Sequence, residues 1–232
     1  MDEGLPLQAP LEAENVFRGL TDDQLARAAR SGKRIRIPLK STLFRQGDPA
    51  RRCYLVTRGR VKLSKLSETG KEAILRFLGP GQMAAAVAAL TDTRYPATAE
   101  AVEPTEVVGW DKRTFLRLMH DHPPIAFNLL RVTLERLDEI QQRYLELSSE
   151  VVERRIARTL LRLMRHAGSR TRSGVLITIP LSRQSIADYS GTTLYTVSRT
   201  LTAWGKIGWV RSGRERVTVT DPHALVLFAE QR

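Results

Sequence analysis

The sequence has few residues of the kinds that build disulfides, metal cages or membrane spans. Its 232 residues include one cysteine, Cys53, so an intramolecular disulfide and a multi-cysteine metal cage are both excluded. The longest apolar run, Met83 to Leu90, is largely alanine and too short to cross a bilayer. The N-terminus is acidic and lacks the charged, apolar and small-residue series of a signal peptide. We therefore expect a cytoplasmic protein without membrane contact.

Motifs of the common enzyme classes are also absent. The sequence has no P-loop, no G-x-G-x-x-G and no arrangement that suggests a Ser-His-Asp triad. His120 and His122 are two residues apart but flank prolines in an expected turn, and no third metal ligand is evident. We therefore do not expect an enzyme. A metal-dependent enzyme on a cupin-like β-barrel remains the alternative.

Acidic residues are scarce in one part of the chain. Residues 151–232 carry 14 Lys and Arg against 5 Asp and Glu, a net charge of +9. Residues 1–150 carry 23 against 20, a net charge of only +3, and the whole chain has +12. A localised positive surplus is typical of a protein that binds a polyanion such as DNA.

The same basic region contains two short helical patterns joined by a tight turn. Ser182 is a cap-type residue before the first pattern, and Gly191 tolerates the positive φ of a sharp bend. Thr192 or Thr193 then caps a second helix. Its apolar positions recur at helical spacing and include Val197, Leu201 and Trp204. The pattern predicts a helix-turn-helix, although an ordinary helical hairpin with a solvated face would also fit.

Two short strands are expected after this helix pair. Trp209-Val210 and Arg216–Thr220 have strand-like patterns, and Ser212–Arg214 forms a basic turn between them. A helix-turn-helix followed by a two-stranded hairpin is a winged helix, and the basic turn suits the phosphate backbone of DNA.

The N-terminal half has a β pattern from Lys33 to about Trp110. Short apolar segments alternate with turn residues, as in an antiparallel sandwich or barrel. The expected strands are Lys33–Ile37, Tyr54–Val56, Val61–Leu66, Ala73–Leu78 and Thr105–Trp110. The turns between them are expected at Gln46–Pro49, Arg58–Arg60, Glu68–Gly70 and Gly79–Gly81.

The stretch from Leu43 to Gln82, LFRQGDPARRCYLVTRGRVKLSKLSETGKEAILRFLGPGQ, resembles the β-roll of the CRP/FNR superfamily of bacterial transcription regulators. The helix-turn-helix resembles the same family. This resemblance implies an α+β protein: a cyclic-nucleotide-binding-like antiparallel β-roll with flanking short helices at 1–120, a dimerisation helix at 121–148 and a winged helix at 149–232. It further implies a homodimer that binds palindromic double-stranded DNA, responds to an effector and works with RNA polymerase. A module that binds its effector with little DNA specificity is a further alternative.

The dimerisation helix is expected from about Ile125 to Ser148, a length of about 35 Å. One heptad-like seam comprises Phe127, Leu130, Leu134, Leu137, Gln141, Tyr144 and Ser148. A second stripe comprises Leu129, Val132, Ile140 and Leu147. Two stripes favour a helix that packs on the β-roll with one and on a second subunit with the other, rather than a helix buried within one chain.

The resemblance also points to the DNA contacts. Arg199 aligns with the family's guanine-reading arginine, and Ser198 is similar to a serine that the FNR branch uses beside it. Tyr195 replaces the glutamate that reads a cytosine amine, so the half-site is expected to differ there from the usual TGA-containing sequence or to be read loosely at that base pair. Leu194 can contact a thymine methyl group. The expected phosphate contacts are Arg183, Gln184, Thr193, Thr196, Arg214 and Arg216.

The sequence departs from the family where relatives bind cyclic AMP. Ala86 stands in place of the ribose-binding glutamate, and Tyr95-Pro96 stand in place of the phosphate-binding Arg-Ser. Arg94 is one residue away, and a shift of one residue in a strand reverses the direction of the side chain. We therefore expect an effector other than a cyclic nucleotide. Cys53 alone cannot hold the iron–sulfur cluster of the oxygen-sensing branch.

A small-molecule or gas effector is expected instead. The predicted pocket comprises Met83, Ala85, Ala86, Val87 and Tyr95, where alanines leave room for a bulky apolar group. The run from Tyr95 to Ala101 is similar to the branch that handles nitric oxide, nitrosative stress and denitrification, of which some members use haem.

Any haem would need an axial ligand. The candidates are His120, His122, Met83, Cys53 and His166, although each also has an ordinary structural interpretation. The thiol of Cys53 has a second interpretation. Neighbouring arginines could lower its pKa and make it a redox sensor, or it could be a small buried residue.

Overall fold

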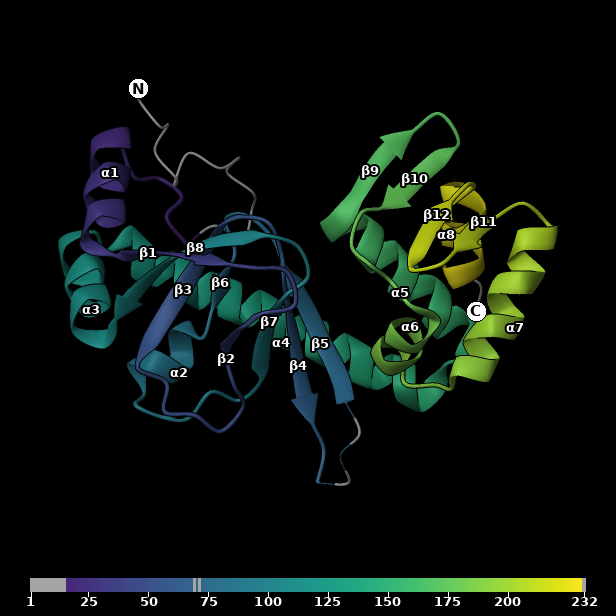
Figure 1. Cartoon of the computed structure of the whole chain (residues 1–232), viewed down its shortest axis with the longest axis horizontal. Helices are drawn as coiled ribbons and strands as arrows, with labels where there is room; N and C mark the ends of the chain where they lie inside the picture. The colour runs from purple at the N-terminus through teal and green to yellow at the C-terminus, as the bar shows by residue number, and fades with distance from the viewer. Residues whose placement is uncertain (1–15, 69, 71, 231–232) are drawn as a thin grey trace. The chain divides into compact units, whose positions relative to one another are not determined.

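The computed structural model describes residues 16–68, 70 and 72–230 and comprises two compact units (Figure 1). The N-terminal unit contains the described residues up to Leu66 together with Arg76–Glu139. The C-terminal unit contains Ser67–Leu75, as far as it is described, and the described residues from Ile140 onward. The boundary between the units at Glu139 and Ile140 falls inside one long helix, α4 (Pro124–Ser149).

Two four-stranded sheets form the β-roll of the N-terminal unit, and the strand pairs with a determined register are antiparallel. The first sheet has the order β1 (Lys33–Ile37), β8 (Thr105–Asp111), β3 (Arg52–Arg58), β6 (Met83–Ala84). The second has the order β2 (Thr42–Phe44), β7 (Thr98–Ala101), β4 (Val61–Leu66), β5 (Glu72–Leu78). The five expected strands are confirmed, and the short strands β2, β6 and β7 were not predicted.

Two hydrophobic clusters hold this unit together. The first lies inside the roll, where residues of both sheets such as Val56 and Val61 pack together. The second packs the first sheet, through residues such as Trp110, against the helices α1 (Asp22–Ser31), α2 (Ala86–Leu90), α3 (Lys112–Asp121) and the first half of α4. The predicted α+β class with an antiparallel β-roll is therefore confirmed.

The expected turns of the roll are confirmed by the backbone of their glycines. Gly47, Gly59, Gly70 and Gly81 all have positive φ values. At Gly59 a Cβ atom would also lie 2.5 Å from the carbonyl oxygen of Pro104. A side chain at this position would therefore be strained and would clash with the neighbouring backbone.

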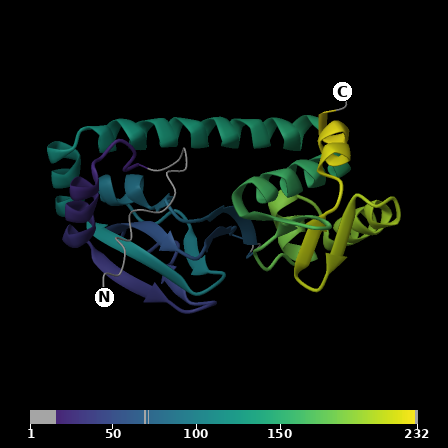
Figure 2. The same ribbon diagram turned by 90° about the horizontal axis from the view of Figure 1, so that it is seen from above.

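Helix α4 runs unbroken over its residues (Figure 2), one residue longer at each end than predicted. Leu129 and Val132 of the predicted second stripe are buried in the N-terminal unit. Ile140 and Leu147 are 63% and 53% exposed, so this stripe packs only over its first half. The prediction that one whole stripe packs on the β-roll therefore holds only for Leu129 and Val132, because the second half of the helix belongs to the other unit.

The C-terminal unit contains the predicted winged helix. Its helices are α5 (Val152–Ala167), α6 (Arg183–Ser190), α7 (Leu194–Lys206) and α8 (Pro222–Glu230). Its sheet has the order β11 (Val210–Gly213), β12 (Arg216–Val219), β10 (Gly174–Ile177), β9 (Gly168–Thr171). Ser182 caps α6, Gly191 ends it with φ +64°, and Thr193 caps α7, so the expected helix boundaries are confirmed.

The first strand of the wing begins at Val210 rather than at Trp209, and the wing differs from the prediction in two further respects. Its turn lies at Arg214-Glu215 rather than at Ser212–Arg214, because Gly213 pairs with Arg216 and leaves only these two residues between the strands. The sheet also gains the β9–β10 hairpin, which was not predicted because its polar residues, GSRTRSG, resemble a loop.

Ion pairs between glutamate and arginine side chains connect the end of α4 to the winged helix. Glu146 is only 3% exposed, and its carboxylate accepts hydrogen bonds of 2.8 and 2.9 Å from Nη1 of Arg162 on α5. Glu150 accepts from Nε of Arg158 at 3.1 and 3.0 Å. Arg155 donates to the carbonyl oxygen of Glu150 and, on the other side, to those of Ser190 and Gly191 at the end of α6. These arginines therefore connect three helices across the break between α4 and α5.

We expect Glu146→Ala to lower the free energy of unfolding by about 2–4 kcal/mol, because the Arg162 guanidinium, whose side chain is only 19% exposed, would lose its counter-ion. Urea unfolding followed by circular dichroism measures this loss. Glu135→Ala is the matched control on the same helix, because Glu135 forms a 2.6 Å pair with Arg131 in which the two side chains are 47% and 36% exposed. Its expected cost is at most about 1 kcal/mol. Equal losses in the two variants would contradict the assignment.

Candidate nucleic-acid interface

Helix α7 is anchored in the C-terminal unit by its apolar side. Val197, Leu201 and Trp204 are 0%, 1% and 5% exposed, as the spacing predicts. The Trp204 ring lies 6.1 Å from that of Trp209 and 5.7 Å from that of Phe228, centroid to centroid. Because this side is packed, the opposite side of α7 is held toward solvent.

The four predicted base-contacting residues lie on that opposite side. Tyr195 is 74% exposed and Leu194 is 47% exposed. The side chain of Arg199 is 65% exposed, and Ser198 is partly buried beside it. Their spacing along α7 places all four on one helix face, with a guanidinium, two hydroxyl groups and an apolar side chain available to a partner.

The predicted phosphate contacts surround this face. Arg183 on α6 donates from Nη1 to the hydroxyl of Ser198 at 3.2 Å, so a predicted phosphate contact and a predicted base contact touch each other. Thr193 accepts from the backbone N–H of Thr196 at 3.2 Å, and the two hydroxyl oxygens lie 3.0 Å apart. Gln184 donates to Asp188 at 2.8 Å.

The wing adds further positive charge. Arg214 in the turn and Arg216 at the start of β12 are both exposed, as are Arg211 on β11 and Lys206 at the end of α7. Together with Arg183 and Arg199 they account for much of the local charge surplus. Such a surface attracts the phosphate backbone of a nucleic acid.

The sequence analysis did not predict one contact of the exposed face of α7. Arg199 Nη2 lies 3.6 Å from a carboxylate oxygen of Glu153, which is in the first turn of α5. The two residues are 46 positions apart, so no helical spacing relates them. The amino-terminal end of a helix favours a carboxylate, and this was the only local signal at Glu153.

The five predicted effector-pocket residues lie in different surroundings. Met83 and Ala86 are buried in the cluster between the first sheet and the helices. Tyr95 is buried in the cluster inside the roll, and Ala85 packs against the same cluster. Val87 is 50% exposed. Ala85 and Ala86 thus pack against the two hydrophobic clusters, whereas the sequence predicts that they leave room for a ligand.

Tyr95 occupies the inside of the roll with its own ring and hydroxyl group. The ring stacks on Phe44 with centroids 4.0 Å apart. The hydroxyl donates to the carbonyl oxygen of Arg52 and accepts from the backbone N–H of the same residue. Arg94 is exposed and donates to the carbonyl oxygen of Gly47, which agrees with the expected reversal of direction between neighbouring positions.

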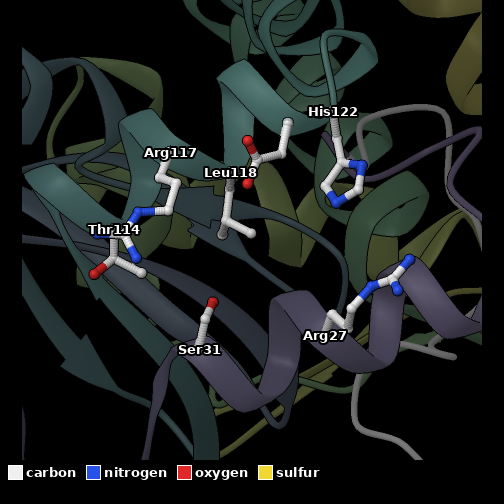
Figure 3. A pocket seen from close by; sticks show the side chains of 7 residues that line it. Arg27, Ser31, Thr114, Arg117, Leu118 and His122 are labelled. Atoms are coloured by element: carbon white, nitrogen blue, oxygen red, sulfur yellow. The ribbon is translucent and has the colours of Figure 1, made fainter.

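A separate pocket of about 360 Å³ lies between α1 and α3 (Figure 3). Arg27 and Ser31 of α1 and Thr114, Arg117 and Leu118 of α3 line it, together with Asp121 and His122. Arg27 is already paired with Asp23 at 3.0 Å, and in Figure 3 its guanidinium and that of Arg117 point in different directions. No predicted effector residue lines this pocket.

The candidate haem ligands do not form a haem site. Cys53 and Met83 are fully packed in the same cluster, at 0% and 1% exposure. The side chain of His120 is 88% exposed, whereas His166 lies in the other unit. Within the described residues no group of three or more His, Cys, Asp or Glu side chains is placed to hold a metal ion. Cys53 and Met83 are therefore enclosed by other side chains of the cluster, which leaves no space for a haem beside them.

The fold and this basic surface define a winged-helix protein that also carries a β-roll unit. The sequence matches the cyclic nucleotide-binding domain family over residues 34–122 and the Crp-like helix-turn-helix domain family over residues 154–228. It is 31% identical to the cyclic AMP receptor protein of Thermus thermophilus, over 91% of this chain and 94% of that protein. It is also 31% identical to the nitrogen fixation regulation protein FixK of Azorhizobium caulinodans, over 90% of this chain and 86% of that protein.

Solved structures agree with these sequence relatives. The catabolite activator protein of Thermus thermophilus is 32% identical and aligns over 92% of this chain and 97% of its own, with a TM-score of 0.54. FixK2 of Bradyrhizobium japonicum, at 24% identity, has the same fold with a TM-score of 0.73 over 87% and 98% of the two chains.

The chain therefore belongs to the CRP/FNR family of DNA-binding transcription regulators. Its relatives are regulators, so the expectation that it is not an enzyme is confirmed, and the cupin-like alternative is wrong. None of the helices in the described ranges is long and apolar enough to span a membrane.

Burial raises the pKa of the Cys53 thiol from its ordinary value of 9.0 to about 12, so the neighbouring arginines do not activate it. At pH 8 we expect iodoacetamide to alkylate the native thiol at least about a hundredfold more slowly than the unfolded one, because only the thiolate reacts. Mass spectrometry with and without urea measures the two rates, and Cys53→Ala controls for labelling elsewhere. Similar rates in the native and unfolded protein would contradict the burial of Cys53.

Because unfolding restores the ordinary pKa of the Cys53 thiol, its contribution to the free energy of unfolding is complete below pH 9 and is lost as the pH rises toward 12.

Proposed function

We propose that this protein is a homodimeric regulator that binds a near-palindromic DNA site and reads each half-site with helix α7. The observation that carries the proposal is the exposed face of α7, where Arg199 lies on a helix that is capped by Thr193 and anchored by a buried side. Helix α7 is already folded and fixed in the free protein, so it can enter the major groove without a further cost in conformational entropy.

The proposed dimer forms through the exposed seam of α4. Phe127, Leu130, Leu134, Leu137 and Tyr144 are between 48% and 73% exposed in the single chain. Such a row of large apolar side chains costs free energy in water and is typical of a surface that another helix covers. Two copies related by a two-fold axis would present their α7 helices to half-sites about 34–36 Å apart.

Base reading is assigned to Arg199, which can donate two hydrogen bonds to O6 and N7 of guanine. Ser198 and Leu194 lie beside it for a further polar and a methyl contact. Tyr195 cannot act as a carboxylate acceptor, so the base pair that it faces is read differently from the usual half-site of the family. Arg183, Gln184, Thr193, Thr196, Arg214 and Arg216 are assigned to the phosphate backbone.

The proposed effector is a small molecule or gas other than a cyclic nucleotide. One relative is named a cyclic AMP receptor protein, but here Tyr95 stacks on Phe44 and binds the Arg52 backbone, and Ala86 has no polar group for a ribose. The likeness of Tyr95–Ala101 to the nitric-oxide branch makes nitric oxide the first gas to test. As a DNA-binding regulator, the protein is proposed to work in the cytoplasm with RNA polymerase.

We expect Arg199→Ala to weaken binding to the preferred site by about 1–3 kcal/mol and to relax the preference at one base pair, because a bidentate guanine contact is lost. Selection of duplexes from a random pool, followed by fluorescence anisotropy, measures both effects. Arg214→Ala is the matched control, and it should weaken all sequences alike and reduce the salt dependence. An unchanged base preference in Arg199→Ala would overturn the assignment.

For the dimer, we expect Leu134→Asp to raise the dissociation constant about thirtyfold or more, because a charge would replace a central apolar contact. Sedimentation velocity over a concentration series measures this change. Leu116→Asp is the control, because Leu116 is also an exposed helical leucine, at 44%, but lies on α3. If both variants sedimented like the original protein, the seam would not be the interface.

A further inference from the structure

We propose that Glu153 determines specificity by favouring contact of Arg199 with a base over contact with a phosphate. This inference rests on the proposed function, in which Arg199 reads guanine. Glu153 belongs to α5, outside the helix-turn-helix, and none of the expected DNA contacts includes it. Its carboxylate nevertheless lies 3.6 Å from the guanidinium of Arg199.

The pair is built by packed helices. Arg199 lies two residues from each of the buried residues Val197 and Leu201 on α7, and Glu153 is in the first turn of α5, three residues before the buried Ile156. Both helices pack against α6. The two charged groups are therefore held near each other by the hydrophobic core of the unit, and Glu153 lies in the first turn of α5, where the helix dipole favours a negative charge.

A guanine base and a backbone phosphate would affect the pair of Arg199 and Glu153 differently. A guanidinium has five N–H donors, so Arg199 can keep its contact with Glu153 and still offer two donors to a base edge. Guanine O6 and N7 are neutral acceptors and bring no charge toward the carboxylate. A phosphate at the same place would bring a second anion close to Glu153, and the repulsion would weaken that contact.

Glu153 therefore penalises non-specific binding more than specific binding. Its side chain is 38% exposed and that of Arg199 is 65% exposed, so solvent and salt screen the interaction. An exposed ion pair of this kind corresponds to a change of about two- to fivefold in an equilibrium constant. This change is enough to alter the ratio of specific to non-specific affinity without altering the fold.

The test uses the full-length protein and the variant Glu153→Gln, which keeps the shape and removes the charge. The first probe is a duplex that the unchanged protein selects from a random pool, and the second is a scrambled duplex of the same length. Fluorescence anisotropy gives both affinities at low and physiological salt. We expect Glu153→Gln to tighten binding of the scrambled duplex about two- to fivefold and to change binding of the selected duplex by less than twofold. No change in the ratio of the two affinities would overturn the proposal.

A double-mutant cycle with Arg199→Ala separates an effect through Arg199 from general repulsion of DNA. If Glu153 acts through Arg199, the effect of Glu153→Gln disappears in the Arg199→Ala background. The same tightening in both backgrounds would overturn the proposal. Glu215→Gln is the control, because Glu215 lies exposed in the wing turn, near Arg214 and Arg216, and should tighten both duplexes equally.

The cycle also distinguishes this inference from the proposed function. If Arg199→Ala leaves the base preference unchanged, Arg199 does not read a base and the proposed function fails. If Arg199→Ala relaxes the preference but Glu153→Gln leaves the affinity ratio unchanged, only the role of Glu153 fails. Circular dichroism melting of each variant confirms that the fold is retained.

Discussion

The buried ion pair between Glu146 and Arg162 is the interaction on which the DNA-recognition surface depends. A carboxylate that is only 3% exposed requires a counter-ion, and Arg162 supplies it from the next helix. This requirement fixes α5 against the end of α4. Arg155, on the same helix, binds the last carbonyl groups of α6, and α6 packs against α7. The position of Arg199 is thus the last step in a series of contacts that begins at a buried charge.

The same series explains why Glu153 and Arg199 meet. Each residue belongs to a helix whose apolar side is buried, and both helices pack against α6. The proposed reading of DNA by Arg199 and its proposed restraint by Glu153 both follow from one packing arrangement. In the N-terminal unit, by contrast, the space inside the roll is occupied by aromatic stacking of Tyr95 on Phe44 and by close-packed alanines. The unit keeps the fold of the family.

Local patterns were sufficient for most of the fold. The caps Ser182 and Thr193 and the glycine at Gly191 marked the helix-turn-helix almost to the residue, because capping and positive φ are decided by the nearest neighbours along the chain. Helix α1 could have been predicted in the same way, since Thr21 and Gln24 form a complete capping box. The β9–β10 hairpin could not, because β10 also pairs with β12, whose partner residues lie 40 to 44 positions further along the chain.

The sequence by itself determined the family, the α+β class, the winged helix and the side of α7 that carries Arg199, because hydrophobic periodicity and turn chemistry depend on residues close together in the chain. Only the tertiary structure decided that Cys53 is buried, that the alanines are packed rather than open, and that Glu153 touches Arg199. These three facts depend on which surfaces of distant segments come together. Burial and pairwise electrostatics act through space, and no spacing along the chain records them.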